Sequence, residues 1–407
     1  MNAQKQDRKD SMKINLPEDV TTIITTLEAA GYEAYAVGGC VRDSCLGRTP
    51  DDWDVTTSAM PGEIKATFRH TVDTGIEHGT VTVLCYHGDG TMGAYEVTTY
   101  RIDGNYADGR HPDHVEFTPS LTEDLKRRDF TINAMAYNGR CGLVDKFDGM
   151  GDLERKVIRC VGVPAERFDE DALRILRAVR FSAQLGFEIE AETAAAIREK
   201  APNLARISKE RVYVEITKLI CSARHERIEA VKALGMTPYI GEGFGVTEPA
   251  DVSLPEIPTE KRYLRYAVLF RHALPETAAA FLKSLKADND TIRGTVTLAP
   301  MLEAELPEDR YELKCIIGRM GREYFEGLLA LKEELGQDVS VVRAIYVDVT
   351  AKEEPIFLKD LALTGSDLVK AGVTPGPKVG DLLEDMLEVV RRDPAKNAAE
   401  ELEKLYL

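Results

Sequence analysis

The sequence lacks the features that mark several large classes of protein. Its seven cysteines form no C-x-x-C pair, which argues against structural zinc and against a disulfide framework. No long apolar run is present, and the polar segment 1–13 matches neither a secretory signal nor a membrane span. Low-complexity tracts and fixed-period repeats are missing as well. These absences predict a cytoplasmic protein with reduced thiols and no membrane association.

An excess of basic residues, which is common in nucleic-acid-binding proteins, is also missing, because the net charge is −17. The average does not exclude RNA, since phosphate contacts need only one basic surface. Arginine and lysine gather in three short stretches, at 126–128, 174–180 and 206–211. Charge alone therefore neither establishes nor excludes an RNA partner.

The chain of 407 residues, with 43% in the hydrophobic set, is long enough for two to four domains. The first 150 residues alternate short β-rich runs, at 34–37, 81–84 and 95–99, with helical patterns such as 17–30. From about residue 166 the period becomes helical. Expected helices cover 169–185, 191–199 and 209–219 and, after a Gly/Pro-rich segment at 241–258, 260–285 and beyond. Residues 339–350 are rich in β-branched side chains, but their neighbours favour helix, and 375–377 mark a turn between two short helices. The predicted class is α+β: a head with a small mixed sheet, followed by an elongated all-α part.

The run Asp51-Asp52-Trp53-Asp54-Val55 is the strongest local signal. On a strand, residues i and i+2 share a face, so Asp52 and Asp54 would point together. Two carboxylates this close repel each other unless a cation lies between them, and Mg²⁺ is the natural candidate. The alternative is a polar loop with acids placed by chance, and the triplet alone favours this alternative.

The segment before this pair narrows the choice. A buried strand at 35–37 leads to Gly38-Gly39 and a helical stretch, 40–46, that contains Arg42. Two glycines between a strand and a helix let backbone N–H groups approach a phosphate, and Arg42 could add a charged contact. A plain tight turn is the usual meaning of two glycines. Fewer sequences combine two such glycines with an arginine three residues later and a following D-x-D. The combination therefore favours a nucleotide site more than any one of its parts does.

Two further stretches carry candidate residues. Glu96, on a predicted strand, could be the third carboxylate of a two-metal site, or a surface acid on an edge strand. The cluster at 123–134 could be a solvated helix start, capped by Thr131 and Asn133. The functional alternative has Arg128 facing a phosphate, with Asp129 orienting it.

The helical pattern at 170–181 places Leu173, Ile175, Leu176 and Val179 on one arc that faces a core. Asp171, Arg174, Arg177 and Arg180, three residues apart, step around the other arc, and Arg180 reaches its border. A salt-bridged exposed face is the usual meaning of such spacing. The excess of positive charge also suits a phosphate, and an aspartate beside an arginine can hydrogen-bond a base edge.

Together these stretches resemble the class II bacterial CCA-adding tRNA nucleotidyltransferases, in the poly(A) polymerase-like branch of the polymerase β superfamily. The matching segments are 37–43, 52–54, 124–134 and 170–180, within a likeness that spans about residues 35–215. It is weaker beyond 220 and returns at 359–380, which looks like a tail of the Gram-positive type. The resemblance implies four parts: a head at 1–153, a neck at 154–222, a body at 223–340 and a tail at 341–407.

The resemblance also implies an activity and a role for each candidate residue. The family adds CCA to the 3′ end of tRNA from CTP and ATP and releases pyrophosphate, with the acceptor arm along the protein. Asp52 and Asp54 would bind Mg²⁺ and Glu96 would complete the acid set. The implied nucleotide contacts are Gly39, Arg42 and Arg128 for the triphosphate, Asp171 and Arg174 as an amino-acid template for the base, and Arg177 and Arg180 as support for the phosphates and the template helix.

Rival activities are less well matched. Bacterial poly(A) polymerases carry a basic pair after a glycine in the strand following D-x-D, and segment 74–81 lacks one. Enzymes that add only CC lack a flexible loop, whereas 102–114 looks like an intact one; enzymes that add only the terminal A stay open. A non-catalytic RNA-binding protein is disfavoured by the intact Asp52, Asp54 and Arg128. A metal phosphohydrolase would need a His-Asp pair, which the sequence does not contain. No obligate protein partner is inferred, and the turn at 375–380 is either a contact for the tRNA elbow or a plain turn.

Overall fold

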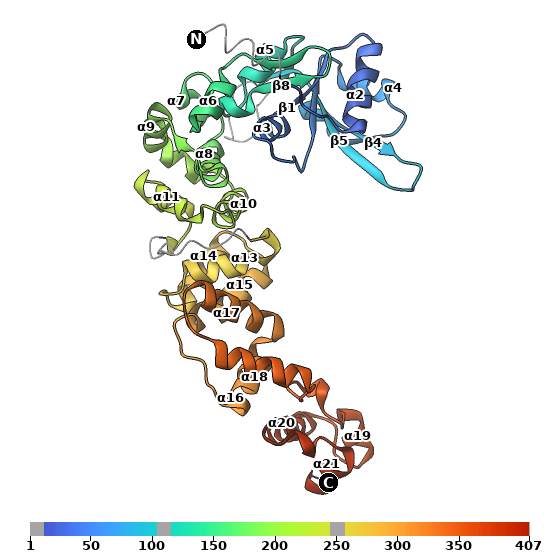
Figure 1. Ribbon diagram of the computed structural model, residues 1–407, viewed down its shortest axis with the longest axis vertical. Helices are drawn as coiled ribbons and strands as arrows, with labels where there is room; N and C mark the ends of the chain where they lie inside the picture. The colour runs from blue at the N-terminus through green and yellow to red at the C-terminus, as the bar shows by residue number, and fades with distance from the viewer. Residues whose placement is uncertain (1–11, 104–114, 245–256, 407) are drawn as a thin grey trace. The chain divides into compact units, whose positions relative to one another are not determined.

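The computed structural model describes residues 12–103, 115–244 and 257–406. The chain divides into two compact units, Met1–Gly245 and Val246–Leu407. The first unit holds the strands and the second is helical, which confirms the predicted α+β class (Figure 1).

A seven-stranded mixed sheet, in the order β3-β4-β5-β2-β1-β8-β9, organises the first part of this unit. Its strands are β1 (Ala34–Val37), β2 (Asp54–Thr57), β3 (Thr71–Gly75), β4 (Thr80–Tyr86), β5 (Met92–Thr99), β8 (Met135–Asn138) and β9 (Gly142–Asp145). Neighbouring strands are antiparallel except β2 and β5, which run parallel with Val55 opposite Val97. The β-rich runs expected at 34–37, 81–84 and 95–99 are β1 and parts of β4 and β5.

Helix α2 (Glu18–Ala29) covers the sheet as its sequence pattern predicts. Its buried side chains are Val20, Ile23, Ile24 and Leu27, which recur at helical spacing. Together with α4 (Pro61–Thr67) it packs against the sheet, on one side of the strands in Figure 1. Pro17 stands at the N-cap, just before the first turn.

The helix expected over 169–185 is two helices, α7 (Pro164–Glu170) and α8 (Leu173–Leu185). The single-helix prediction is wrong because the backbone of Asp171 is extended, with φ −138° and ψ 103°. Its carboxylate accepts a hydrogen bond from the Leu173 N–H at 3.0 Å, at the start of α8. Aspartate is a favoured residue at a helix N-terminus, because its side chain satisfies a free N–H. The break therefore places Asp171 at a helix end and not on a helix face.

The other elements of the first unit are short, apart from two helices that match their predicted ranges. These are α9 (Ala191–Lys200) and α10 (Lys209–Ile220). The remaining elements are α3 (Gly39–Cys45), β6 (Arg101–Asp103), β7 (Val115–Phe117), α5 (Leu121–Lys126), α6 (Gly149–Arg155), β10 (Val157–Ile158), β11 (Glu188–Ile189), α11 (Glu229–Ala233) and α12 (Thr237–Ile240).

The second unit is a succession of helices. They are α13 (Arg262–Leu269), α14 (Pro275–Ser284), α15 (Asn289–Leu298), α16 (Arg310–Met320), α17 (Arg322–Glu334), α18 (Ser340–Ala351), α19 (Gly365–Lys370), α20 (Pro377–Arg392) and α21 (Ala399–Tyr406). The stretch expected at 260–285 is thus broken into α13 and α14. Residues 340–351 are helical despite their β-branched side chains, as predicted. The turn at 375–377 precedes α20, which at 16 residues is longer than the short helix expected.

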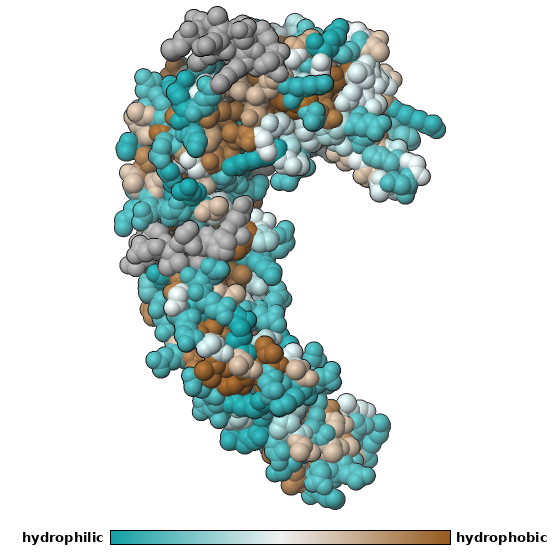
Figure 2. Space-filling view, viewed as in Figure 1, coloured by the Kyte–Doolittle hydropathy of each residue, from teal (hydrophilic) through white to brown (hydrophobic). Residues whose placement is uncertain are grey.

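Two hydrophobic clusters stabilise the later helices. One joins α16, α17 and α18 and extends to Ile356. The other joins α19, α20 and α21 with Leu361 and Leu363. Figure 2 shows a largely hydrophilic surface, with hydrophobic residues gathered over α17 and α18. None of the helices in the described residues is long and apolar enough to cross a membrane.

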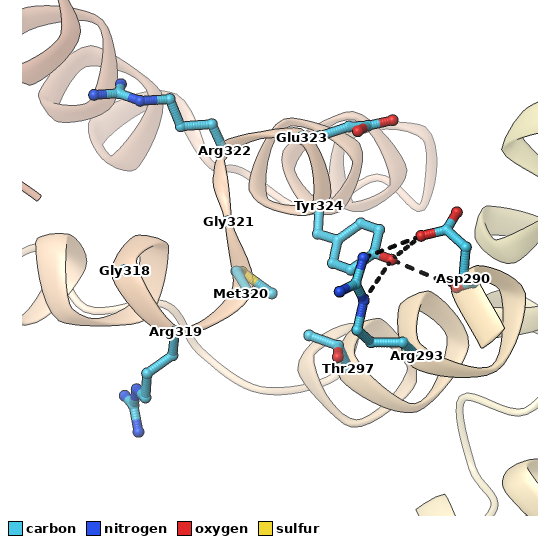
Figure 3. A pocket seen from close by; sticks show the side chains of 10 residues that line it. All are labelled: Asp290, Arg293, Thr297, Gly318, Arg319, Met320, Gly321, Arg322, Glu323 and Tyr324. Carbon is cyan, nitrogen blue, oxygen red and sulfur yellow. Dashed lines mark hydrogen bonds and ion pairs between the residues drawn. The ribbon is translucent and has the colours of Figure 1, made fainter. Parts of the chain in front are cut away.

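A hollow of about 390 Å³ lies between α15, α16 and α17 (Figure 3). Arg293 there is held by Asp290 at 3.2 Å and by the Tyr324 hydroxyl at 3.2 Å. Arg319 and Arg322 point away from each other in Figure 3, so the arginines do not converge on one point. The candidate active-site residues all lie in the first unit, away from this hollow in the sequence.

Candidate active site

The two aspartates of the D-x-D segment lie at the start of β2. The sequence pattern predicted both aspartates on one strand. The strand begins at Asp54, however, so Asp52 precedes it. Both side chains are exposed, while Val55 is buried. The parallel register that pairs Val55 with Val97 places Asp54 opposite Glu96, whose side chain is also exposed. Strand pairing thus places the third predicted carboxylate beside Asp54.

The pKa of the Asp54 carboxyl group reflects this arrangement. Surrounding protein raises its pKa by desolvation, Arg128 opposes that rise, and the charges of Glu96 and Asp52 add to it. A carboxylate whose pKa is raised by neighbouring negative charges is stabilised in its ionised form by a bound cation. Within the residues that the structure describes, no three His, Cys, Asp or Glu side chains form a group that could hold a metal ion. The pair still fits a hard cation that completes its shell with phosphate oxygens and water.

The Gly38-Gly39 turn lies beside the same carboxylates, because Val37 pairs with Asp54 across β1 and β2. Gly38 has φ +84°, in the left-handed region that favours glycine. A Cβ atom on Gly38 would come within 3.0 Å of Nη1 of Arg128. The glycine therefore allows the Arg128 guanidinium to lie against the turn, where α3 begins at Gly39.

Arg128 is oriented by Asp124, and not by Asp129 as the sequence had suggested. Asp124 is fully buried; it accepts a hydrogen bond from Arg127 at 2.9 Å and a longer one from Arg128 at 3.4 Å. Burial alone would raise the pKa of Asp124, but the two arginines lower it below its ordinary value. The i, i+4 spacing of Asp124 and Arg128 was the signal in the sequence, since such residues are neighbours on a helix.

Asp129 binds Arg177 instead. Its Oδ2 accepts from Nε of Arg177 at 2.8 Å, and its Oδ1 accepts from Nδ2 of Asn133 at 3.0 Å. Oδ1 of Asn133 in turn accepts from Nη1 of Arg42 at 2.6 Å, and Arg42 also binds the Asp43 carboxylate. Burial raises the pKa of Asp129, but Arg177, Asn133 and Arg174 together lower it to about 2. A continuous polar chain thus joins α3 to α8.

The arginines of α8 are more buried than the sequence pattern indicated. Arg174 and Arg180 are only 8% and 7% exposed, although both were expected on the arc away from the core. Each is paired: Arg174 donates to the half-buried Glu170 at 2.6 Å and to the Arg127 carbonyl at 2.9 Å, and Arg180 pairs with the buried Glu215 at 2.6 Å. Buried charges are tolerated when they are paired in this way. The apolar arc was correct, since Leu173, Ile175, Leu176 and Val179 are all buried.

Asp171 has a partner that the sequence did not reveal. Its Oδ2 accepts from Nη2 of Arg211, on α10, at 2.9 Å. Sequence reasoning also missed Glu215, and it gave Asn133 only as a helix cap, because the arginines that they bind, Arg180 and Arg42, lie far away in the chain. The loop that argued against CC-only addition, 102–114, lies outside the described residues from 104 onward.

Three family models match successive parts of the chain. "Poly A polymerase head domain" matches residues 34–159 and "Probable RNA and SrmB-binding site of polymerase A" matches 186–240. A model of tRNA nucleotidyltransferase domain 2 matches 259–405.

Curated relatives and solved structures agree with these matches. The CCA-adding enzyme of Leuconostoc mesenteroides is 38% identical over 411 residues, which cover 97% of this chain and 98% of the relative. That of Lactiplantibacillus plantarum is 40% identical, with 90% of each chain covered. The crystal structure of the Bacillus stearothermophilus CCA-adding enzyme in complex with CTP is 30% identical, with a TM-score of 0.78 over 95% of this chain and 97% of that one. Thermotoga maritima CCA-adding enzyme complexed with tRNA shares the fold, at 20% identity and a TM-score of 0.63 over 97% of this chain and 99% of that one. The chain therefore belongs to the family of bacterial CCA-adding enzymes.

Proposed function

We propose that this protein adds C, C and A to the 3′ end of tRNA, using CTP and ATP. The observation that carries the proposal is the position of three consecutive residues, Arg127, Arg128 and Asp129. Arg128 acts on the Asp54 carboxylate, while the Arg127 carbonyl and Asp129 bind Arg174 and Arg177 of α8. Residues 127–129 thus connect the start of β2, where Asp54 lies, to α8, which carries Arg174 and begins just after Asp171. The relatives named above, one of them in complex with CTP and another with tRNA, support the same activity.

The reaction joins the 3′-hydroxyl of tRNA to the α-phosphate of the nucleotide. The new P–O bond replaces the bond between the α- and β-phosphates, so pyrophosphate leaves. Family membership implies a divalent metal ion, and we propose Mg²⁺, held by Asp52 and Asp54 with Glu96 completing the acid set. When bound, such an ion lowers the pKa of the attacking hydroxyl and offsets the charge of the triphosphate.

The residues of the chain divide the work of holding the nucleotide. Arg128, placed by Asp124, and Arg42, placed by Asp43 and Asn133, lie where they can bind triphosphate oxygens. The N–H of Gly39, at the start of α3, adds a backbone donor.

Base selection is assigned to Asp171 and Arg174, which would pair with the hydrogen-bonding edge of cytosine or adenine. A site built to pair with a base edge rejects partners that leave buried polar groups unsatisfied. Arg177 and Arg180, bound to Asp129 and Glu215, support the template helix.

The parts of the chain are proposed to act in sequence: a catalytic head at 1–153, a base-reading neck at 154–222, a body at 223–340 and a tRNA-binding tail at 341–407. A cytoplasmic location is proposed as well, and the seven free cysteines support it.

The test is an extension assay. Purified protein is incubated with a tRNA that ends at the discriminator base, together with Mg²⁺ and CTP, ATP or both, and the products are sequenced. We expect one or two C residues with CTP alone and a complete CCA end with both nucleotides. Poly(A) tails, CC ends from the mixture, or only a terminal A on a CC-ending tRNA would each refute full CCA addition. Full incorporation by Asp54→Ala would refute the assigned site.

A further inference from the structure

Three guanidinium groups surround one aromatic ring in the first unit. The Cζ atoms of Arg42, Arg177 and Arg180 lie 5.1, 5.2 and 4.1 Å from the centre of the Phe181 ring. These distances are within the range of attraction between a cation and the face of a ring. The ring is 5% exposed, so water weakens these contacts little. Phe130 meets the same ring edge to face, with the centres 5.8 Å apart.

The three arginines come from both halves of the candidate active site. Arg42 belongs to α3, beside the sheet, whereas Arg177 and Arg180 flank Phe181 on α8. Each is already paired with a carboxylate, respectively of Asp43, Asp129 and Glu215. The ion pairs account for the charges, and Asn133 with Asp129 also links Arg42 to Arg177, but Arg180 is not part of that polar chain. The Phe181 ring is the one side chain that all three contact among the interactions described above.

We infer that Phe181 is a positioning residue that holds Arg42 of the head and helix α8 of the neck in register. The inference rests on the proposed function, in which the head binds the triphosphate and the neck reads the base. The base and the triphosphate of one nucleotide are a fixed span apart. Discrimination therefore requires Arg42 and Asp171 to keep a fixed separation, and small misplacements in such sites strongly reduce the rate. Phe181 contributes to that separation by contacting Arg42 directly and by lying on α8, whose first residue, Leu173, donates its N–H to Asp171.

The experiment compares Phe181→Leu, which removes the ring face, with Phe181→Tyr, which keeps it. Phe187→Leu is the matched control, because Phe187 is 3% exposed, lies just after α8 and belongs to no part of the proposed site. Circular dichroism and thermal melting verify folding, and Phe181→Met replaces Phe181→Leu if the leucine variant does not fold. Steady-state kinetics with CTP and with ATP give KM and kcat separately, and UTP and GTP measure misincorporation.

Loss of the ring is expected to raise KM for CTP and ATP about tenfold and to increase UTP and GTP incorporation relative to them. Phe181→Tyr should restore both quantities towards wild type, while Phe187→Leu should lower only the melting temperature. Unchanged KM and discrimination in a folded Phe181→Leu or Phe181→Met protein would overturn the inference, and so would an equal change in Phe187→Leu. Failure of the wild-type protein to extend tRNA would instead overturn the proposed function.

Discussion

Replacing Asp129 with asparagine tests the buried link between the sheet and α8. The substitution keeps the shape of the side chain but removes the charge that faces Arg177 at 2.7 Å. Asn133 and the backbone N–H of Phe130, which donate to Asp129 at 3.0 and 2.8 Å, lose a charged acceptor as well. Arg177, whose side chain is half-buried, would then lose the carboxylate that compensates its charge.

The pKa of Asp129 sets the lower bound of the effect. Its folded-state value of about 2 lies below the ordinary 3.8, despite the burial that opposes this. At 1.36 kcal/mol per unit, ionisation of this one group stabilises the fold by about 2 kcal/mol. Since the folded-state pKa is depressed, this stabilisation is present above about pH 4 and is lost as the pH falls from about 4 to about 2. Removing one partner of a buried pair costs about 3–5 kcal/mol in other proteins, which sets the upper bound.

The assay is urea unfolding followed by the fluorescence of Trp53, the single tryptophan, which lies in the first unit. At pH 7 the free energy of unfolding of Asp129→Asn should be lower than that of wild type by about 2–5 kcal/mol. The difference should shrink by about 2 kcal/mol as both proteins are taken to acid, because wild type loses the same charge by protonation. Glu192→Gln, at an exposed position on α9, should change stability by less than about 0.5 kcal/mol. A difference at pH 7 no larger than that of the control, or one that does not shrink in acid, would refute the reasoning.

Three further predictions concern other parts of the molecule. Asp54→Asn should abolish nucleotide transfer and yet raise the melting temperature in EDTA. Burial, Glu96 and Asp52 raise the pKa of Asp54, so its negative charge destabilises the metal-free fold at neutral pH. A lower melting temperature would contradict this. Mg²⁺ should stabilise wild type in a thermal-shift assay but not Asp54→Asn, and equal shifts would remove the proposed metal ligand. Deleting residues 361–407 spares the α16–α18 cluster and removes the α19–α21 cluster. The deletion should weaken tRNA binding in a filter assay, while nucleotide binding persists. Unchanged tRNA affinity would exclude residues 361–407 as a tRNA contact.

The sequence predicted the elements whose patterns are local. Helix α2, strands β1 and β5 and the apolar face of α8 follow directly from the spacing of their hydrophobic residues. The break at Asp171 was missed because the apolar period runs on through α8, whereas the extended backbone of Asp171 and its 3.0 Å hydrogen bond from the Leu173 N–H are visible only in the structure. A local side-chain hydrogen bond is a weaker signal in a sequence than hydrophobic periodicity, although the helix is interrupted here.

The partners of the arginines could not be predicted in the same way. Arg177 was placed on the arc away from the core, and its partner Asp129, far away in the chain, was not foreseen. The same is true of Arg180 with Glu215 and of Asp171 with Arg211. Pairs four residues apart, Asp124 with Arg128 and Glu170 with Arg174, offered a local clue. Pairing over long range depends on how the sheet and the helices pack, which no single segment encodes.

The parallel pairing of β2 and β5 makes the alignment of Asp54 with Glu96 depend on correct strand register. Asp54 and Glu96 meet only in the register that sets Val55 against Val97, and these valines are 1% and 0% exposed. A shift of one residue would turn Glu96 into the core and a valine out to water, because side chains alternate between the two faces of a strand. Mispaired chains would therefore be unstable as well as inactive. Insertions within β5 should consequently be far more damaging than insertions in the turn between β4 and β5, where no such alternation is at stake.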